Sequence, residues 1–280
     1  MRRVLPPPII SRPIEKVSLA NKMLRGLFDS LIVQGGLQME KKVVIVGAAE
    51  MAMMAYFYLT HDSPYEVAAF TVDRKYIRDE SLCGLPVVPF EDIETTCPPG
   101  DFEMLVAISF SKQNSTRADK YFQVKAKGYG LIKYVSSKAI TWPGLVIGDN
   151  SLVCEGSVIN PFVEIGNNVV IAGSFIGHHS IVKDHCFLAA NSVVLGCATI
   201  EPYSVIGANA TILDKVVVAR ECIIGAGVTV NRSTMERAVY VDNPPELLPK
   251  SSNAMNTLIT WPRGAARSTS RNNEAALREN

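Results

Sequence analysis

Residues 176–212 read IGHHSIVKDHCFLAANSVVLGCATIEPYSVIGANATI, and every sixth residue of this stretch is aliphatic. The series starts at Ile176 and continues without interruption to Val230, with glycine after several of its members. A period of six does not fit the 3.6-residue turn of an α-helix. It is typical of a solenoid in which each hexapeptide supplies one short strand and a turn, so that three hexapeptides close a triangular coil.

The repeat also runs upstream, with one slip of phase. A second series of aliphatic residues six apart begins at Ile147 and ends at Ile171, and the step from Ile171 to Ile176 is only five. The stretch from Leu145 to Thr234 is long enough for five coils of three hexapeptides each. Residues three hexapeptides apart should therefore stack on adjacent coils, about 4.8 Å from each other, whereas residues one hexapeptide apart should lie on neighbouring faces.

A different pattern precedes the repeat. Residues 42–47 (KVVIVG) are a short apolar run that ends in glycine, which is typical of a buried parallel strand. Strands then alternate with helices, which indicates a small doubly wound sheet. We expect strands at residues 42–47, 67–73, 104–109 and 130–134, and helices at residues 48–59 and 114–128.

These patterns predict a fold that is α/β plus all-β. A small Rossmann-like domain is expected at residues 39–138 and the hexapeptide β-helix at residues 139–245. Residues 1–38 hold several prolines and precede a second methionine, Met39, so they are expected to be a poorly ordered extension or an upstream misassigned start. Residues 246–280 are polar toward their end and are expected to be an excursion with a disordered tail.

Charge and composition argue against several classes of protein. Lys and Arg number 28 against 27 Asp and Glu, and a net charge of +1 disfavours nucleic-acid binding. No apolar stretch is long enough to span a bilayer and no secretory signal is present, which predicts a cytoplasmic protein. None of the six cysteines forms a C-x-x-C pair, which argues against a zinc ribbon and against a redox motif. Four of them fall at recurrent solenoid positions and are expected in its core: Cys154, Cys186, Cys197 and Cys222.

Three of the four histidines lie in one short stretch, at His178, His179 and His185. Because His179 and His185 are one hexapeptide apart, they should leave the solenoid at different corners and cannot readily share one metal ion, so no metal is expected. A general base is the better interpretation, since a neutral imidazole can take a proton from an amine or a hydroxyl near pH 7. Asp184 and Glu164 are candidates for an acid that orients this base.

The order of these parts resembles a known family. Val43-Val-Ile-Val-Gly47, Phe70-Thr-Val-Asp73 and the later Ile176-Gly-His-His-Ser-Ile are similar to the bacterial sugar O- and N-acetyltransferases, which are left-handed β-helix hexapeptide transferases. The relatives include the bacillosamine-pathway UDP-4-amino-sugar N-acetyltransferases and proteins like the sialic-acid O-acetyltransferases. The resemblance covers roughly residues 41–245. It implies that acetyl-CoA is the co-substrate, that the acceptor is a sugar amine or hydroxyl in surface-polysaccharide or glycan biosynthesis, and that the protein is a homotrimer with active sites between solenoids.

The resemblance also implies roles for residues of the solenoid. His178 matches the position of the family's base, and the phase slip leaves His179, which stands where the family has an acid, as an alternative base. Coenzyme A in the family runs along the later coils, and this contact carries over to Gly196, Ala208 and Ala226.

A further implied site holds the nucleotide of a sugar acceptor. It comprises the turn of Gly47, Ala48 and Ala49 and the acid after the second strand, Asp73. The family turn is richer in glycine, and Glu50 of this chain would repel a nearby phosphate.

Two other functions fit parts of the pattern. A trimeric hexapeptide scaffold that binds ligands without catalysis would explain the altered glycine turn. NAD-dependent oxidoreduction would use the strand, glycine, helix and acid at the start, but two of the three glycines of G-x-G-x-x-G are missing. Acyl transfer is the leading hypothesis and oxidoreduction the last.

Overall fold

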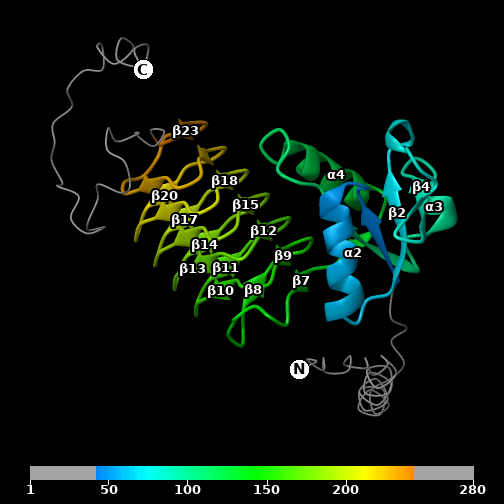
Figure 1. The fold of residues 1–280 in the computed structure, drawn as a ribbon, viewed down its shortest axis with the longest axis horizontal. Coiled ribbons are helices and arrows are strands. Elements are labelled where there is room, and N and C mark those ends of the chain that lie inside the picture. Colours follow the sequence, from blue (N-terminus) through cyan, green and yellow to red (C-terminus); the bar gives the residue numbers. More distant parts are fainter. Residues whose placement is uncertain (1–41, 243–280) are drawn as a thin grey trace, which may run out of the picture. The chain divides into compact units, whose positions relative to one another are not determined.

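The computed structural model describes residues 42–242, which belong to one compact unit (Figure 1). The extension predicted at residues 1–38 and the tail predicted at residues 246–280 lie outside the described residues. A six-stranded sheet with helices comes first, and a stack of triangular coils follows. No helix among the described residues is long and apolar enough to cross a membrane.

The first sheet has the strand order β3-β4-β2-β1-β5-β6 and is parallel except for the β3–β4 pair. Its strands are β1 (Lys42–Val46), β2 (Val67–Val72), β3 (Ser81–Leu82), β4 (Leu85–Pro89), β5 (Phe102–Val106) and β6 (Gly130–Leu131). Its helices are α2 (Glu50–Asp62), the 3₁₀ turn η1 (Arg74–Tyr76), α3 (Ile93–Thr96) and α4 (Ser115–Ala126). The predicted strands and helices are present, although the last predicted strand is split, and β3, β4 and α3 were not predicted.

Successive residues of β1 point to opposite sides of the sheet, and both sides are covered. Val43 and Ile45 pack with Leu59 of α2 in one apolar cluster. Val44 packs with Val124 of α4 in a second cluster. This explains why the strand reads as a continuous apolar run, since a strand buried on both faces has no polar side.

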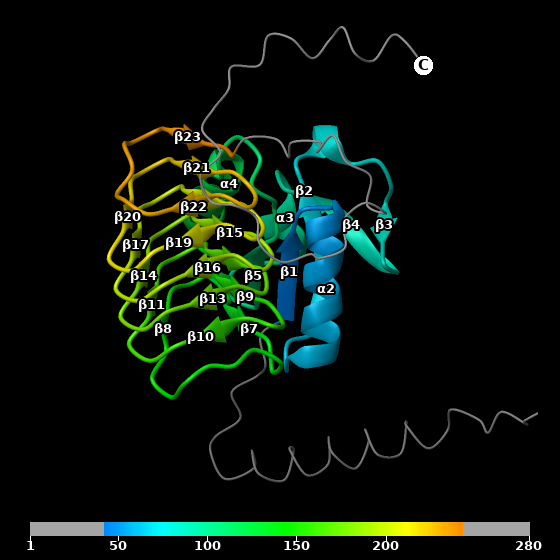
Figure 2. The ribbon, with the colours of Figure 1, turned by 60° about the vertical axis from the view of Figure 1, so that its left-hand side comes forward.

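The coils that follow form a parallel β-helix with three faces, which we name after their first strands (Figures 1 and 2). The β7 face has β7 (Tyr134–Val135), β9 (Leu152–Val153), β12 (Val170–Ile171), β15 (Phe187–Leu188), β18 (Val205–Ile206), β21 (Ile223–Ile224) and β23 (Val239–Tyr240). The β8 face has β8 (Val146–Ile147), β11 (Glu164–Ile165), β14 (Ile181–Val182), β17 (Thr199–Ile200) and β20 (Val217–Val218). The β10 face has β10 (Val158–Ile159), β13 (Phe175–Ile176), β16 (Val193–Val194), β19 (Thr211–Ile212) and β22 (Thr229–Val230).

The register of the coils confirms both the repeat and its slip. Val193 pairs with Thr211, three full hexapeptides further on, whereas the pairing of Val158 with Phe175 is one residue shorter. From β8 to β22 the second residue of each strand is the repeated aliphatic one, and it points into the coil, as the fully buried Ile176 does. Each such side chain contributes about 1.5–3 kcal/mol through burial, so the period of six is also the period of the core.

One cysteine departs from its predicted place in the core. Cys154, Cys186 and Cys222 are buried, but Cys197 is exposed. Cys197 stands two residues before a strand, at the turn position with a left-handed φ of 58°, whereas Cys186 and Cys222 directly precede a strand. The left-handed residue of the turn points outward, and the expectation for Cys197 was wrong for this reason.

A carboxylate at the end of α2 ties this helix to the start of the coils. Oδ2 of Asp62 accepts hydrogen bonds from the hydroxyls of Tyr134 and Ser136, at 2.7 and 2.8 Å, and from the N–H of Ser137, at 2.9 Å. Burial by itself would raise the pKa of Asp62, but these hydrogen bonds outweigh it and lower the pKa to about 2.

We therefore expect Asp62→Asn to lower the free energy of unfolding by about 1–2 kcal/mol at pH 7. The folded pKa lies below the unfolded value of 3.8, so this stabilisation is present above about pH 4 and is lost as the pH falls toward 2. Urea unfolding of both proteins between pH 7 and pH 3 measures the difference. Asp101→Asn changes an exposed carboxylate without a described partner and serves as the control. A gap between wild type and Asp62→Asn that did not narrow in acid would contradict the prediction.

Candidate functional site

Two adjacent imidazoles stand at the corner between the β10 and β8 faces, in the turn from β13 to β14. His178 and His179 are both exposed, and their Nδ1 atoms share a hydrogen bond of 3.1 Å. His179 has a left-handed φ of 58°, and its N–H donates to the carbonyl of Pro161 in the preceding coil. We call this edge the histidine corner, and it comprises the turns at residues 160–163, 177–180, 195–198 and 213–216.

Each histidine of the pair contacts one neighbouring coil. A Cβ built on Gly196 would lie 2.8 Å from both Cε1 and Nε2 of His178, so the ring fills the space that a larger residue would need. The N–H of Gly196 donates to Oδ1 of Asp214, 3.0 Å away in the coil beyond. In the coil before, the exposed ring of Phe162 packs on His179 with the centroids 4.6 Å apart.

His185 leaves the β-helix at a different corner, as predicted. It lies between β14 and β15, is buried, and packs on the ring of Tyr203 in the next coil, with the centroids 4.7 Å apart. Burial lowers the pKa of His185 to about 4, against a smaller opposite effect of Asp184. The imidazole is therefore neutral at pH 7 and closed to a substrate. No group of three His, Cys, Asp or Glu side chains within residues 42–242 is placed to hold a metal ion.

The two acids considered as partners of the base do not contact it. Oδ1 of Asp184 accepts the N–H of Asn167 at 2.7 Å, at the corner that also carries His185. Glu164 is exposed on β11 of the β8 face. In the described part of the chain, neither carboxylate forms a hydrogen bond or an ion pair with the histidine pair, whose side chains are hydrogen-bonded to each other.

The residues implied for coenzyme A lie at two edges of the β10 face. Gly196 belongs to the histidine corner, and the ring of His178 packs against it. Ala208 and Ala226 stack one above the other at the opposite edge, where the carbonyl of Ala208 accepts the N–H of Gly227 at 2.9 Å. The structure therefore brings Gly196 to the histidines, while the two alanines form a separate pair.

The residues implied for a nucleotide lie where the central strands β1 and β2 end. Gly47 has a φ of +133°, and a Cβ there would lie 2.7 Å from the carbonyl oxygen of Ala107, so close backbone packing requires this glycine. Asp73 follows β2 and pairs with Nζ of Lys120 of α4 at 2.5 Å. The same ammonium lies 4.0 Å from the ring centroid of Phe90. Asp73, the acid implied for the nucleotide site, is therefore already paired with a lysine of the same chain.

The turn between β1 and α2 has free backbone but an unfavourable charge. Ala48 and Ala49 are exposed, and no side chain caps the first turn of α2. Uncapped N–H groups at a helix start suit an anion. The exposed carboxylate of Glu50 stands in the same first turn and opposes a phosphate there.

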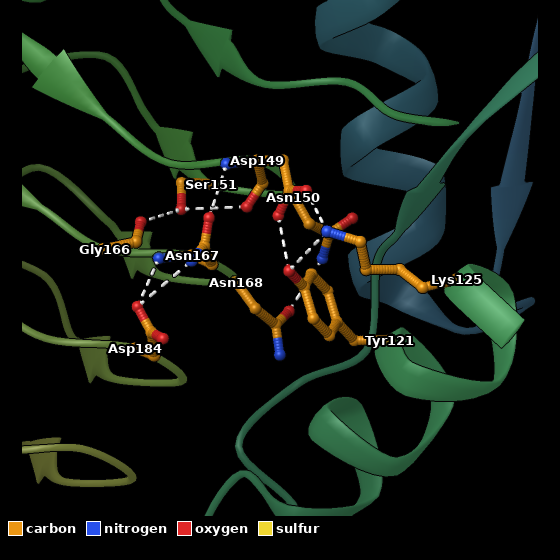
Figure 3. Close-up of polar contacts among 9 residues, drawn as sticks. All are labelled: Tyr121, Lys125, Asp149, Asn150, Ser151, Gly166, Asn167, Asn168 and Asp184. Carbon is orange, nitrogen blue, oxygen red and sulfur yellow. Dashed lines mark hydrogen bonds and ion pairs between the residues drawn. The ribbon is translucent and has the colours of Figure 1, made fainter. Parts of the chain in front are cut away.

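A ladder of buried polar side chains joins β5 to the corner of His185. Oδ1 of Asn150 accepts the N–H of Val106 at 2.7 Å. Nδ2 of Asn150 donates to Oδ1 of Asn168 at 2.7 Å (Figure 3). With its Oδ1 fixed as an acceptor, Asn168 donates through Nδ2 to Nδ1 of His185, 2.8 Å away. His185 therefore carries its proton on Nε2.

Arg117 of α4 is fully buried against this ladder. Its Nε donates to Oδ1 of Asn168 at 3.2 Å, and its Nη2 donates to the carbonyls of His185 and Cys186 at 3.3 and 3.0 Å. Its Nη1 donates to Oδ1 of Asn114 at 3.0 Å. No carboxylate of the described residues pairs with it, and burial lowers its pKa to about 10, so it stays protonated at pH 7.

These polar residues were not predicted from the sequence. On the outer side of the ladder, Asp149 accepts from the hydroxyl of Tyr121 and from Nζ of Lys125, both at 2.6 Å (Figure 3). One signal was available in the repeat, because Asn150 and Asn168 are one coil apart at the same left-handed turn position. Asparagine suits that conformation, but nothing in the pattern connects it with an arginine that precedes the repeat.

A depression of about 410 Å³ lies on the β8 face, beside this ladder. It is lined by strands β8, β11 and β14 and by Lys183, Asp184 and Pro202. A Cβ on Gly166 would lie 2.3 Å from Oδ1 of Asp184, so a larger residue does not fit at this position of the lining. The two acids considered as partners of the base, Glu164 and Asp184, line it, but the residues implied as the base, for coenzyme A and for a nucleotide do not.

The sequence of the coils matches a known family model. Residues 179–214 and 197–232 match the model described as bacterial transferase hexapeptide (six repeats), which confirms the predicted repeat. A comparison with curated protein sequences gave no match.

Solved structures share the fold of the described residues. A histidine-to-asparagine variant of perosamine N-acetyltransferase from Caulobacter crescentus, with CoA and GDP-perosamine, is 23% identical over 74% of this chain and 94% of that chain, with a TM-score of 0.64. The acetyltransferase domain of PglB from Neisseria gonorrhoeae, with acetyl coenzyme A, is 18% identical over 75% of this chain and 100% of that chain, with a TM-score of 0.64. WeeI from Acinetobacter baumannii is 20% identical over 74% of this chain and 100% of that chain, with a TM-score of 0.62. At this identity the matches establish the fold, and they confirm the predicted fold class.

Proposed function

We propose that this chain is an acyltransferase that moves the acetyl group of acetyl-CoA to an amine or a hydroxyl of a sugar. The observation that carries the proposal is the exposed, hydrogen-bonded pair of His178 and His179 beside Gly196. One imidazole of the pair takes the proton of the acceptor while the acceptor nitrogen or oxygen attacks the thioester carbonyl. The C–S bond breaks, and coenzyme A leaves and is protonated to the thiol.

The likeness to acetyltransferases crystallised with CoA, acetyl-CoA and GDP-perosamine supports these ligands for this chain. In the proposal, coenzyme A runs past Gly196 toward Ala208 and Ala226. A nucleotide-linked acceptor would meet Gly47 to Ala49 and Asp73. The active protein is proposed to be a cytoplasmic homotrimer that acts in surface-polysaccharide or glycan biosynthesis and needs no metal.

A thiol-release assay tests the proposal. The full chain is mixed with acetyl-CoA and a panel of nucleotide-linked amino sugars, free amino sugars and neutral sugars, and free coenzyme A is measured with a thiol reagent. Release that depends on one acceptor class, with an acetylated product of the corresponding mass, is the expected result. Release with no member of the panel would count against acyl transfer to sugars.

A catalytically inactive scaffold is the second candidate, and the turn after β1 favours it. Glu50 opposes a phosphate, and Asp73 is already paired with Lys120. Titration calorimetry with acetyl-CoA separates the two functions. The enzyme should bind acetyl-CoA with a measurable heat, whereas a scaffold of this kind should give none.

We expect Gly196→Ala to lower turnover about tenfold, because the new methyl group would occupy the space of the His178 imidazole. The displaced group is the end of a side chain and the φ of Gly196 is not left-handed, so the melting temperature should change by only a few degrees. Gly100→Ala is a matched control, since a Cβ there meets nothing within 4 Å. Full activity of Gly196→Ala would show that the observed position of the His178 ring is not the active one.

A further inference from the structure

We propose that His178 is the base of the acyl transfer and that His179 is a positioning residue that sets the tautomer of His178. The inference rests on the proposed function and assigns separate roles to two neighbouring imidazoles. It makes this site an imidazole–imidazole pair, in which a neutral ring does what a carboxylate does in the Ser-His-Asp arrangement. In this arrangement Phe162 positions the ring of His179.

The hydrogen bond between the two rings decides where the protons are. With the Nδ1 atoms 3.1 Å apart, one carries a hydrogen and the other must accept it. Nε2 of a neutral imidazole has a free lone pair only if the hydrogen is on Nδ1. His178 therefore acts as a base through Nε2 when its Nδ1–H donates to Nδ1 of His179.

The surroundings of the rings show which of them is the fixed partner. His179 is held by its left-handed backbone, by its N–H bond to Pro161 and by the ring of Phe162. Nε2 of His178 lies instead next to Gly196, 2.8 Å from where a Cβ of that residue would be, and Oδ1 of Asp214 lies 3.2 Å from the same point. The His178 side chain is exposed, so it can meet a substrate, and Gly196 is the residue implied for contact with coenzyme A.

The proton balance of the step follows from this arrangement. Nε2 of His178 takes the proton of the attacking amine or hydroxyl as the new bond to the carbonyl carbon forms. The resulting imidazolium keeps its Nδ1–H on Nδ1 of His179, so the positive charge is stabilised by a neutral acceptor. As the C–S bond breaks, the imidazolium returns the proton to the sulfur of coenzyme A, and His178 is neutral again.

Two substitutions at position 179 separate positioning from structure. His179→Asn keeps an acceptor atom, and asparagine takes the same left-handed conformation at Asn150 and Asn168. His179→Phe keeps a ring without an acceptor, and Phe162 occupies the equivalent turn of the preceding coil with a φ of 66°. Both variants should fold, and thermal unfolding checks this.

The readout is kcat and KM for acetyl-CoA and for the acceptor found in the thiol-release assay. His179→Phe should lower kcat about tenfold or more, with both KM values within about twofold, while His179→Asn should keep kcat within about threefold. Phe162→Ala retains both imidazoles and should lower kcat severalfold, because His179 loses its stacking partner.

Equal kcat values for the Phe and Asn variants would overturn the inference, whether both match wild type or both fall together. Loss of activity in His179→Phe combined with an active His178→Asn would overturn it as well, because His179 would then be the base. An inactive wild type is a different result, since it removes the proposed function and not the assignment of roles within it.

Discussion

Replacing Arg117 with methionine is expected to lower the free energy of unfolding by about 3–5 kcal/mol. Methionine fills much of the volume but donates no hydrogen bond, so the carbonyls of Asn168 and His185 and Oδ1 of Asn114 would be left buried without a donor. Each such group costs about 1–3 kcal/mol. Urea unfolding of the full chain at pH 7 measures the loss.

Two further variants sharpen this experiment. Arg117→Lys keeps the charge but not the planar fork, so a single ammonium cannot reach all these acceptors and most of the loss should remain. Arg78→Met removes an exposed arginine without a described partner and should change stability by no more than about 0.5 kcal/mol. A stable Arg117→Met protein would show that the arginine is dispensable and that α4 is held by its apolar contacts.

Replacing both His178 and His179 with alanine is expected to reduce the turnover of acyl transfer at least about 10²-fold. The double variant removes the base and every imidazole that could replace it at this corner, which settles the role of the pair without depending on which ring is the base. Because both side chains are exposed, the melting temperature should change little. Steady-state thiol release with acetyl-CoA measures the effect.

His61→Ala is the control for this pair. His61 is an exposed histidine at the end of α2, with Nδ1 hydrogen-bonded to the carbonyl of Phe57 at 2.8 Å. Its replacement should leave turnover unchanged. Undiminished activity of the double variant would refute an imidazole base at the histidine corner, and calorimetry with acetyl-CoA would then test whether the chain is a scaffold.

The β-helix could be predicted almost completely from the sequence. Its strands pair one coil away, so a local period of six also fixes the long-range partners, as Val193 and Thr211 show. Even the slip before Ile176 appears in the structure, because Val158 pairs with Phe175, one position short of the regular spacing. The left-handed turn positions were less visible, and Cys197 was placed in the core for this reason.

The α/β sheet was predicted less well. The long apolar strands such as β1 were found, but β3, β4 and α3 were not. These elements are short, and β4 contains Pro86 and Pro89, which weaken any strand pattern. The pairing of β4 with β2 and of β3 with β4 comes from tertiary packing, which no local period records.

The candidate site was likewise predicted in part and missed in part. The sequence alone singled out His178 and His179 as candidates and placed His185 at a different corner, because spacing determines which corner a residue occupies. It did not identify the contact of Phe162 with His179. It also suggested Asp184 and Glu164 as acids, although neither contacts the pair in the described residues.

The sequence by itself determined the solenoid, the order of its coils and the corner of each histidine, because in a repeat each of these follows from counting residues. Only the tertiary structure decided which atoms meet. Asp73 is paired with Lys120, Arg117 is buried among neutral oxygens, and the two Nδ1 atoms face each other. These contacts join segments of unrelated spacing, and hydrogen bonds depend on differences of a few tenths of an ångström, which a sequence pattern does not contain.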